Sequence, residues 1–275
     1  MLTLDKALLE SVLEIAEQAG EAILKIYHQS EDVVIERKDD NSPVTEADHA
    51  AHQVIVSALK KQYPEVPVFS EESGGIDFNE RKDWPEFWLV DPLDGTKEFI
   101  NRTGEFTVNI ALIQNREPVL GVVTVPLNNS GYIGAREVGA YKVLDHEPWQ
   151  AIRVREINHE QLIVVGSRRH GAEALDALIA RLSQHFHSIE TANMGSSLKF
   201  CLIAEGKADI YPRLAPTSEW DTAAAQAVLM EAGGVVLDTA FNPLRYNKGE
   251  SVLNPHFYAF GDTGVDWQDM IEGHH

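Results

Sequence analysis

Apolar side chains recur every three or four positions along roughly the first thirty residues, which predicts an amphipathic helix packed against a core. Its apolar positions are Leu8, Val12, Ile15, Ala19, Ile23 and Ile26. Two continuous apolar runs, 106–113 and 119–125, flank a turn at 115–118, and they predict a pair of strands. Segments 131–135 and 139–143 continue this pattern. The first part of the chain is therefore expected to contain an antiparallel sheet.

The pattern changes near residue 150, where strand-like and helix-like segments begin to alternate. Strands are predicted near positions 162, 188 and 209, and helices near positions 172, 196 and 219. Such alternation is typical of a mixed or parallel sheet covered by helices. We therefore divide the chain into two α/β units, 1–150 and 151–271. Residues 272–275 resemble the remnant of an expression tag, and their two histidines are excluded from metal arguments.

Composition narrows the class of function. The chain has 275 residues and a net charge of −20, which argues against binding a nucleic acid polymer through a basic surface. Its single cysteine, Cys201, excludes a disulfide within the chain. No apolar run is long enough to cross a membrane, and the N-terminus lacks the regions of a signal peptide. We expect a cytoplasmic protein, with peripheral attachment to the inner face of the cell membrane and the oligomeric state left open.

The segment from Asp91 to Thr96 is the strongest candidate for chemistry. It follows an apolar strand at 87–90 and places Asp91 and Asp94 three positions apart, with Pro92 and Gly95 permitting a sharp turn. Two carboxylates and a nearby carbonyl oxygen are ligands that Mg²⁺ prefers. A helix beginning near Thr96 would direct its free N–H groups at a bound phosphate. The segment predicts a metal-phosphate site, although a loop closed by Asx turns is the simpler alternative.

Three other acidic stretches accompany this segment, and each has a plain structural alternative. The Glu71-Glu72 pair follows a short strand at 68–70 and could be a solvated acidic turn. Thr45 to Asp48 opens a helical pattern and could be only a capping box. Glu219-Trp220-Asp221 begins a helix that is predicted to run to Gly233-Gly234. Acids in the first turn of a helix usually serve only to interact with the helix dipole.

In this order, the four stretches resemble the motifs of the inositol monophosphatase family, which comprises Mg²⁺-dependent, lithium-sensitive phosphatases. The resemblance implies a layered α/β/α/β/α sandwich with the active site between the two halves. It also implies two or three Mg²⁺ ions. One ion would be held by Glu71, Asp91 and the Leu93 carbonyl, and a second by Asp91, Asp94 and Asp221.

The resemblance further implies that the nucleophile is a water activated by the metal ions. Thr96, hydrogen-bonded to Asp48, would orient this water and help deprotonate it, with Glu71 close by. Chemistry through an aspartyl-phosphate requires two acids separated by one residue, whereas two residues separate Asp91 from Asp94. We therefore discount that chemistry, and a binding protein without turnover has little support because the metal carboxylates are all present.

The segments 195–200, 211–213 and 216–224 resemble the bacterial 3′(2′),5′-bisphosphate nucleotidases of the CysQ type. This implies hydrolysis of 3′-phosphoadenosine 5′-phosphate to AMP, with 3′-phosphoadenylyl sulfate as a second candidate substrate, in a step linked to sulfate assimilation. The implied substrate-binding residues are Gly95, Thr96, Ser196, Lys199, Arg213 and His170. Lys199 and Arg213 would bind the second phosphate. His170 would stack on adenine, although a charged surface turn explains its segment equally well.

Inositol-specific relatives tend to carry a sugar-binding acid before the last metal aspartate, where this chain has Leu214, Ala215, Pro216 and Thr217. This favours a nucleotide substrate. An inositol or other sugar phosphatase is the main alternative. The sequence leaves open the preference among these substrates and the number of ions bound at rest.

Overall fold

Two β-sheets separated by helices form the framework of the protein in a computed structural model that describes residues 1–29, 35–37, 43–145, 147–166 and 172–273. The larger sheet has seven strands in the order β3-β4-β5-β6-β7-β8-β9, and all neighbours are antiparallel except β3 and β4. Its strands are β3 Val68–Ser70, β4 Glu86–Asp94, β5 Thr107–Gln114, β6 Glu117–Val125, β7 Ser130–Ala135, β8 Gly139–Leu144 and β9 Gln150–Ala151. The antiparallel sheet predicted for the first part of the chain is confirmed.

The smaller sheet has five strands in the order β11-β10-β12-β14-β13 and is mixed, because β10 pairs in parallel with β11 and β12. Its strands are β10 Gln161–Gly166, β11 Ser188–Asn193, β12 Ile210–Arg213, β13 Val235–Asp238 and β14 Phe257–Phe260. Outside both sheets, β1 Ile35–Arg37 and β2 Pro43–Thr45 form a separate hairpin-like pair. The change of pattern near residue 150 thus marks the passage from the first sheet to the second, while the division into two domains stays a prediction.

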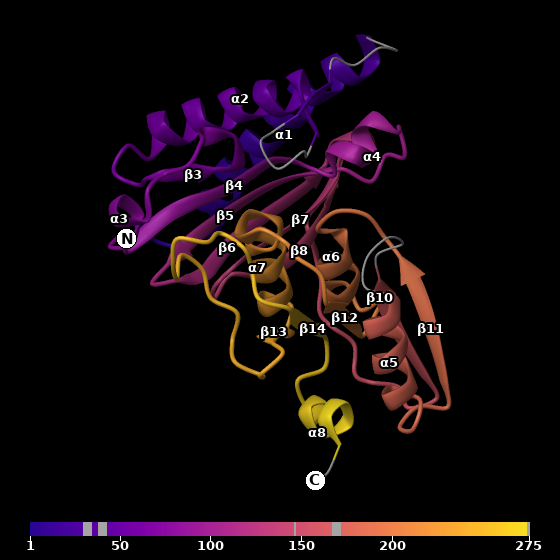
Figure 1. Ribbon diagram of the computed structural model, residues 1–275. Helices are drawn as coiled ribbons and strands as arrows, with labels where there is room; N and C mark the ends of the chain where they lie inside the picture. The colour runs from indigo at the N-terminus through magenta and orange to yellow at the C-terminus, as the bar shows by residue number, and fades with distance from the viewer. Residues whose placement is uncertain (30–34, 38–42, 146, 167–171, 274–275) are drawn as a thin grey trace.

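Helices form three layers around the two sheets (Figure 1). Helices α1 Lys6–Gln29 and α2 Glu46–Gln62 cover one face of the larger sheet, and α6 Leu198–Ala204 and α7 Ala223–Glu231 lie between the sheets. Helices α5 Ala172–Leu182 and α8 Trp267–Glu272 pack on the outer face of the smaller sheet. The layered α/β/α/β/α sandwich is confirmed.

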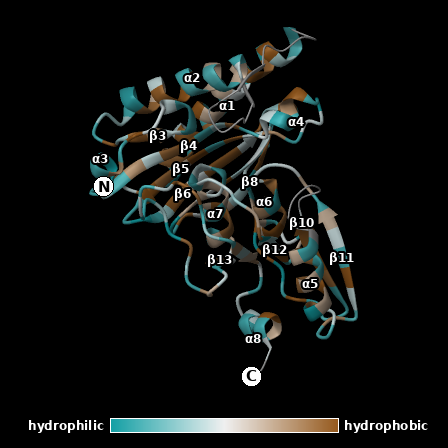
Figure 2. Ribbon diagram, viewed as in Figure 1, coloured by the Kyte–Doolittle hydropathy of each residue, from teal (hydrophilic) through white to brown (hydrophobic). Residues whose placement is uncertain are grey.

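The strands β4, β5 and β6 are apolar on both faces because helices cover both faces. Figure 2 shows mostly brown residues along these strands, while α2 carries teal residues on its outer surface. Val122 of β6 packs toward α1, whereas Val123 packs toward α7 and its core. Gly121 lets α7 approach closely, since a Cβ there would lie 1.9 Å from the carbonyl oxygen of Ala224.

Several short helices lie in the connections between the longer elements. They are η1 Glu71–Ser73, α3 Phe78–Arg81, α4 Thr96–Ile100, η2 Pro126–Asn128 and η3 Glu219–Asp221. The helix predicted from position 219 is therefore divided, because a turn of 3₁₀ helix ends at Asp221 and α7 begins at Ala223. Among the described residues, no helix is long and apolar enough to cross a membrane.

Candidate active site

Three carboxylates meet between the two sheets. Asp91, Asp94 and Asp221 each place a carboxylate oxygen within 4.8 Å of the others. Asp91 and Asp94 lie at the end of β4, where the pairing with β5 shifts register between them. Asp221 ends η3, in the second half of the chain. The register shift at the strand end allows both β4 carboxylates to face the third one.

The clustering of these acids has a large electrostatic cost. Burial raises the pKa of Asp91 well above its usual value, and the charges of Glu71, Asp94 and Asp221 raise it further. Burial, with the charges of Asp94 and Glu71, raises the pKa of Asp221 to about 8. Burial also raises the pKa of Asp94, to about 6. Lys199 and the backbone N–H of Ser197 limit this rise, since both stabilise the charged carboxylate. Such a group holds either protons or a cation.

The donor set fits a hard divalent cation. It offers the oxygens of Asp91, Asp94 and Asp221, and Glu71 is close enough to hydrogen-bond to Asp91. The carbonyl oxygen of Leu93, which lies between Asp91 and Asp94 in the chain, is 3.4 Å from the Thr96 hydroxyl oxygen. Carboxylate and carbonyl oxygens without any sulfur or imidazole are typical of Mg²⁺ sites. The four carboxylates predicted as metal ligands are thus brought together, while the role of the Leu93 carbonyl stays a prediction.

Thr96 and Asp48 are joined by a hydrogen bond of 3.1 Å from the Thr96 hydroxyl to Oδ1 of Asp48. The other carboxylate oxygen of Asp48 accepts the Thr45 N–H at 2.8 Å and its hydroxyl at 2.7 Å. Asp48 therefore completes the capping box of α2 and contacts Thr96 at once. Burial raises the pKa of Asp48, and the two bonds from Thr45 partly oppose this rise.

Helix α4 begins at Thr96, as predicted, but it has only five residues. Its dipole is correspondingly small. Gly95 precedes it with φ of 91°, and a Cβ at this position would lie 3.0 Å from the carbonyl oxygen of Glu105. The turn between Asp94 and Thr96 therefore requires glycine at position 95.

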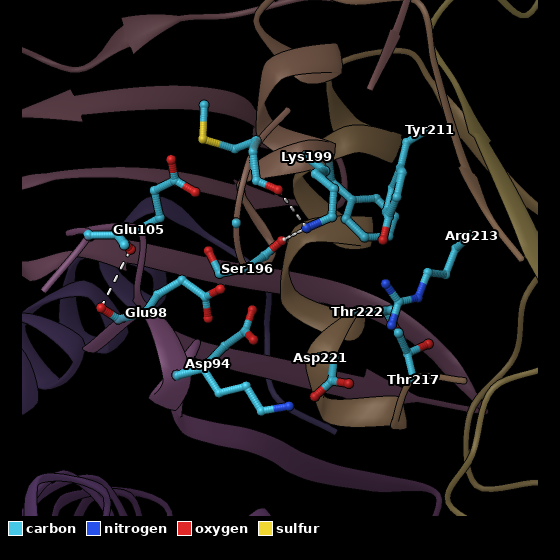
Figure 3. A pocket seen from close by; sticks show the side chains of 15 residues that line it. Asp94, Glu98, Glu105, Ser196, Lys199, Tyr211, Arg213, Thr217, Asp221 and Thr222 are labelled. Carbon is cyan, nitrogen blue, oxygen red and sulfur yellow. Dashed lines mark hydrogen bonds between the residues drawn. The ribbon is translucent and has the colours of Figure 1, made fainter. Parts of the chain in front are cut away.

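A cavity of about 300 Å³ opens beside the carboxylates. Figure 3 shows Asp94 and Asp221 at one side of it and Lys199, Tyr211 and Arg213 at another. Both acidic and basic side chains therefore face the same space. This arrangement suits a ligand that carries a phosphate near the metal ligands and a second anionic group farther away.

Lys199 is buried, with 6% of its surface exposed. Its ammonium group donates to the carbonyl of Ser196 at 2.6 Å and to that of Met194 at 3.2 Å, and it lies over the Tyr211 ring. An ammonium group has three N–H donors, so these two bonds leave one for a ligand. Burial lowers the pKa of Lys199 to about 8, although the charge of Asp94 opposes this change.

The guanidinium of Arg213 donates to the carbonyls of Ala215 and Pro216, at 3.1 and 2.7 Å. This leaves part of its fork directed toward the cavity, as Figure 3 shows. Ser196 also lines the cavity, and its buried hydroxyl has no hydrogen-bond partner among the described residues. His170, the remaining predicted substrate contact, lies outside the described residues.

Comparison with known proteins gives this geometry its context. The model of the inositol monophosphatase family matches residues 5–263. The chain belongs to the inositol monophosphatase family. It is 47% identical to the 3′(2′),5′-bisphosphate nucleotidase CysQ of Escherichia coli K12, over 91% of this chain and 98% of that protein. It is 40% identical to the CysQ of Haemophilus influenzae, over 99% of both chains.

Solved structures agree with this family membership. The crystal structure of CysQ from Bacteroides thetaiotaomicron superposes with a TM-score of 0.81 and 42% identity, over 93% of this chain and 97% of that one. An inositol monophosphatase from Zymomonas mobilis superposes with a TM-score of 0.76 and 22% identity, over 98% of both chains. The second likeness shows the inositol monophosphatase fold alone.

A buried polar triad next to Asp91 and Asp94 was not predicted from the sequence. The Ser197 hydroxyl donates to Oδ1 of Asn109 at 2.7 Å and lies 3.1 Å from the hydroxyl of Thr107. Asn109 and Thr107 are the β5 residues paired with Asp91 and Asp94. The triad thereby fixes Ser197, whose backbone N–H hydrogen-bonds to the Asp94 carboxylate. Polar residues within an apolar strand, as in the Thr-x-Asn of β5, are the one signal that could have indicated it.

Proposed function

We propose that the protein is a Mg²⁺-dependent 3′(2′),5′-bisphosphate nucleotidase that hydrolyses 3′-phosphoadenosine 5′-phosphate to AMP and phosphate. The observation that carries this proposal is the cavity in which two cations, Lys199 and Arg213, face the carboxylates Asp94 and Asp221. A monophosphate needs only the metal ligands, whereas a bisphosphate needs further cations. The names of the E. coli and H. influenzae relatives support the same substrate.

We assign the metal ligands as the family pattern implies. Glu71, Asp91 and the Leu93 carbonyl would hold one Mg²⁺, and Asp91, Asp94 and Asp221 would hold a second. When bound, Mg²⁺ lowers the pKa of water and offsets the charge of the phosphate group. The amides of Gly95 and Thr96 stand beside this site and bind the phosphate oxygens.

Thr96 and Asp48 move the proton of the attacking water. The Thr96 hydroxyl already donates to Oδ1 of Asp48. The Thr96 hydroxyl accepts a proton from the water and passes its own proton to Asp48. The raised pKa of Asp48, which burial causes, makes that carboxylate a better proton acceptor than an exposed aspartate. The catalytic contribution of Glu71 is to accept a hydrogen bond from the same water.

The second phosphate is bound by Lys199, Arg213 and the hydroxyl of Ser196. Lys199 has one N–H left after its two carbonyl bonds, and Ser196 has a hydroxyl without a partner among the described residues. The segment 214–217 offers no carboxylate for a sugar, and its carbonyls instead hold Arg213. Stacking of His170 on adenine belongs to the same proposal, as does a cytoplasmic role in sulfate assimilation.

The test is phosphate release with Mg²⁺ from three substrates: 3′-phosphoadenosine 5′-phosphate, 3′-phosphoadenylyl sulfate and inositol 1-phosphate. We expect a strong preference for a nucleotide, suppressed by Li⁺ as in the family. Preference for inositol 1-phosphate would overturn the assignment of Lys199 and Arg213 while keeping the metal site. No release from any of the three would overturn the proposed activity itself.

A further inference from the structure

Arg81 is an arginine buried outside the active site, with 2% of its surface exposed. It ends α3, and its guanidinium donates to the carbonyls of Gly249 and Glu250 at 2.9 and 2.8 Å. A third bond of 2.5 Å reaches Oδ1 of Asn247. Its Nε also donates to the carbonyl of Ile76 at 3.3 Å. The guanidinium therefore uses four N–H donors, one on Ile76 and three on the segment 247–250. Arg81 fastens the loop 247–250 to the first half of the chain.

Asn247 extends this link to the turn that carries Asp221. Its side-chain amide donates back to the Arg81 carbonyl at 2.6 Å, so that the two residues bond in both directions. Its backbone N–H donates to both carboxylate oxygens of Glu219, at 2.9 and 3.0 Å. Glu219 is the first residue of η3 and Asp221 is the last. The position of Asp221 therefore depends on contacts that begin at Arg81.

The other side of Arg81 faces the strand that leads to Glu71. Its guanidinium carbon lies 5.3 Å from the ring centre of Phe69, two residues before Glu71. The Phe69 ring also meets Trp220 edge to face, with ring centres 5.7 Å apart. Trp220 is the residue before Asp221. Arg81 is thus connected, on two independent routes, to both halves of the metal site.

We propose that Arg81 is a positioning residue that sets the separation of Glu71 and Asp221 and so determines the affinity for divalent cations. Glu71 comes from the first half of the chain and Asp221 from the second, and their like charges repel each other. A rigid connection behind them holds the two carboxylates at a separation that an ion can bridge. Outer residues of this kind commonly alter metal affinity when they are replaced. The inference rests on the metal site of the proposed function.

The sharpest variant is Asn247→Gly. Asn247 has φ of 53°, a conformation that glycine adopts readily, and its backbone N–H would still bind Glu219. Only the two side-chain bonds to Arg81 would be lost. The second variant, Arg81→Lys, keeps the charge but replaces the fork by a single ammonium group. Arg155→Lys is its matched control, since Arg155 makes a bidentate pair with buried Asp209, which directly precedes β12, and neither residue lines the cavity beside the carboxylates.

Mg²⁺ binding to each protein is measured by titration calorimetry without substrate, and kcat is measured at saturating Mg²⁺. We expect Asn247→Gly and Arg81→Lys to weaken Mg²⁺ binding about 10-fold or more, with kcat at saturating Mg²⁺ little changed. Arg155→Lys should keep the wild-type affinity. Wild-type affinity in a folded Asn247→Gly protein, or an equal loss in Arg155→Lys, would overturn the inference. A wild-type protein that binds no Mg²⁺ would instead overturn the proposed metal site.

Discussion

Thr96 donates its hydroxyl hydrogen to Oδ1 of Asp48 at 3.1 Å, across the junction between α4 and α2. Oδ2 of the same carboxylate is held by the N–H and the hydroxyl of Thr45. One aspartate thereby serves a helix cap and the active site. In the mechanism that we propose, Asp48 receives a proton through Thr96, and the cap fixes the orientation of Asp48 before substrate binds.

Thr96→Val tests this relationship. Valine keeps the shape of threonine but removes the hydroxyl that bonds Asp48, so we expect kcat to fall about 100-fold or more, as for loss of a proton-transfer group. Mg²⁺ affinity should change little, because Thr96 is not among the proposed metal ligands. Steady-state kinetics at saturating Mg²⁺ measure the effect. Thr103→Val, at an exposed residue of the same cavity, is the control, and an equal loss there would contradict the role of Thr96.

The parts of the site that could be predicted from the sequence are local in the chain. Asp91 to Thr96 combines a strand end, a turn and a helix start within six residues, and the capping box at Thr45 spans four. Here the sequence spacing alone places the groups side by side. The family resemblance then supplied Asp221, which no local pattern connects to Asp91.

Contacts between distant segments could not be predicted. Arg81 meets Asn247 across 166 positions, and Ser197 meets Asn109 across 88. Neither pair leaves a periodic signal, because each residue serves one specific partner. Local prediction also failed at η3, where the Asp221 carboxylate accepts the Ser218 N–H at 2.8 Å and the chain turns before α7 begins. The sequence indicates that Lys199 binds substrate, but it does not indicate the hydrogen bonds of Lys199 to the carbonyls of Met194 and Ser196.

The metal-free protein should lose stability as pH rises from about 4 to about 8. The pKa of Asp221 is about 8 in the folded state and near 3.8 in the unfolded chain, so the folded state binds more protons between these values. This stabilisation is complete below about pH 4 and lost as pH passes 8. Asp94, with a pKa of about 6, contributes in the same direction.

Urea unfolding with a chelator at about pH 5, 7 and 9 measures this dependence against Asp221→Asn, which cannot titrate. The wild type should be less stable than the variant at the highest pH and approach it at the lowest. Added Mg²⁺ should restore the wild type at high pH, since it binds the charged carboxylates of the folded state. A difference between the two proteins that does not change with pH would contradict the assigned pKa shift.

Lys199→Met should separate bisphosphate from monophosphate substrates. The change removes a charge-assisted hydrogen bond to the second phosphate, worth about 1.5–3 kcal/mol, so kcat/KM for 3′-phosphoadenosine 5′-phosphate should fall about 10- to 150-fold. The loss for 3′-AMP, which lacks the second phosphate, should be much smaller. Lys97→Met, at an exposed lysine of the same cavity, controls for net charge. Equal losses on both substrates would assign Lys199 to holding the 194–196 segment instead.

Gly121→Ala should destabilise the protein because it disturbs the contact between the larger sheet and α7. A Cβ at Gly121 would lie 1.9 Å from the carbonyl oxygen of Ala224, which is backbone and cannot rotate away. We expect a loss of at least about 2 kcal/mol in the free energy of unfolding, since overpacking forces α7 from the sheet. Gly75→Ala is the matched control, because a Cβ there meets nothing within 4 Å. Urea unfolding of the two variants decides the point, and equal stabilities would show that the helix adjusts without cost.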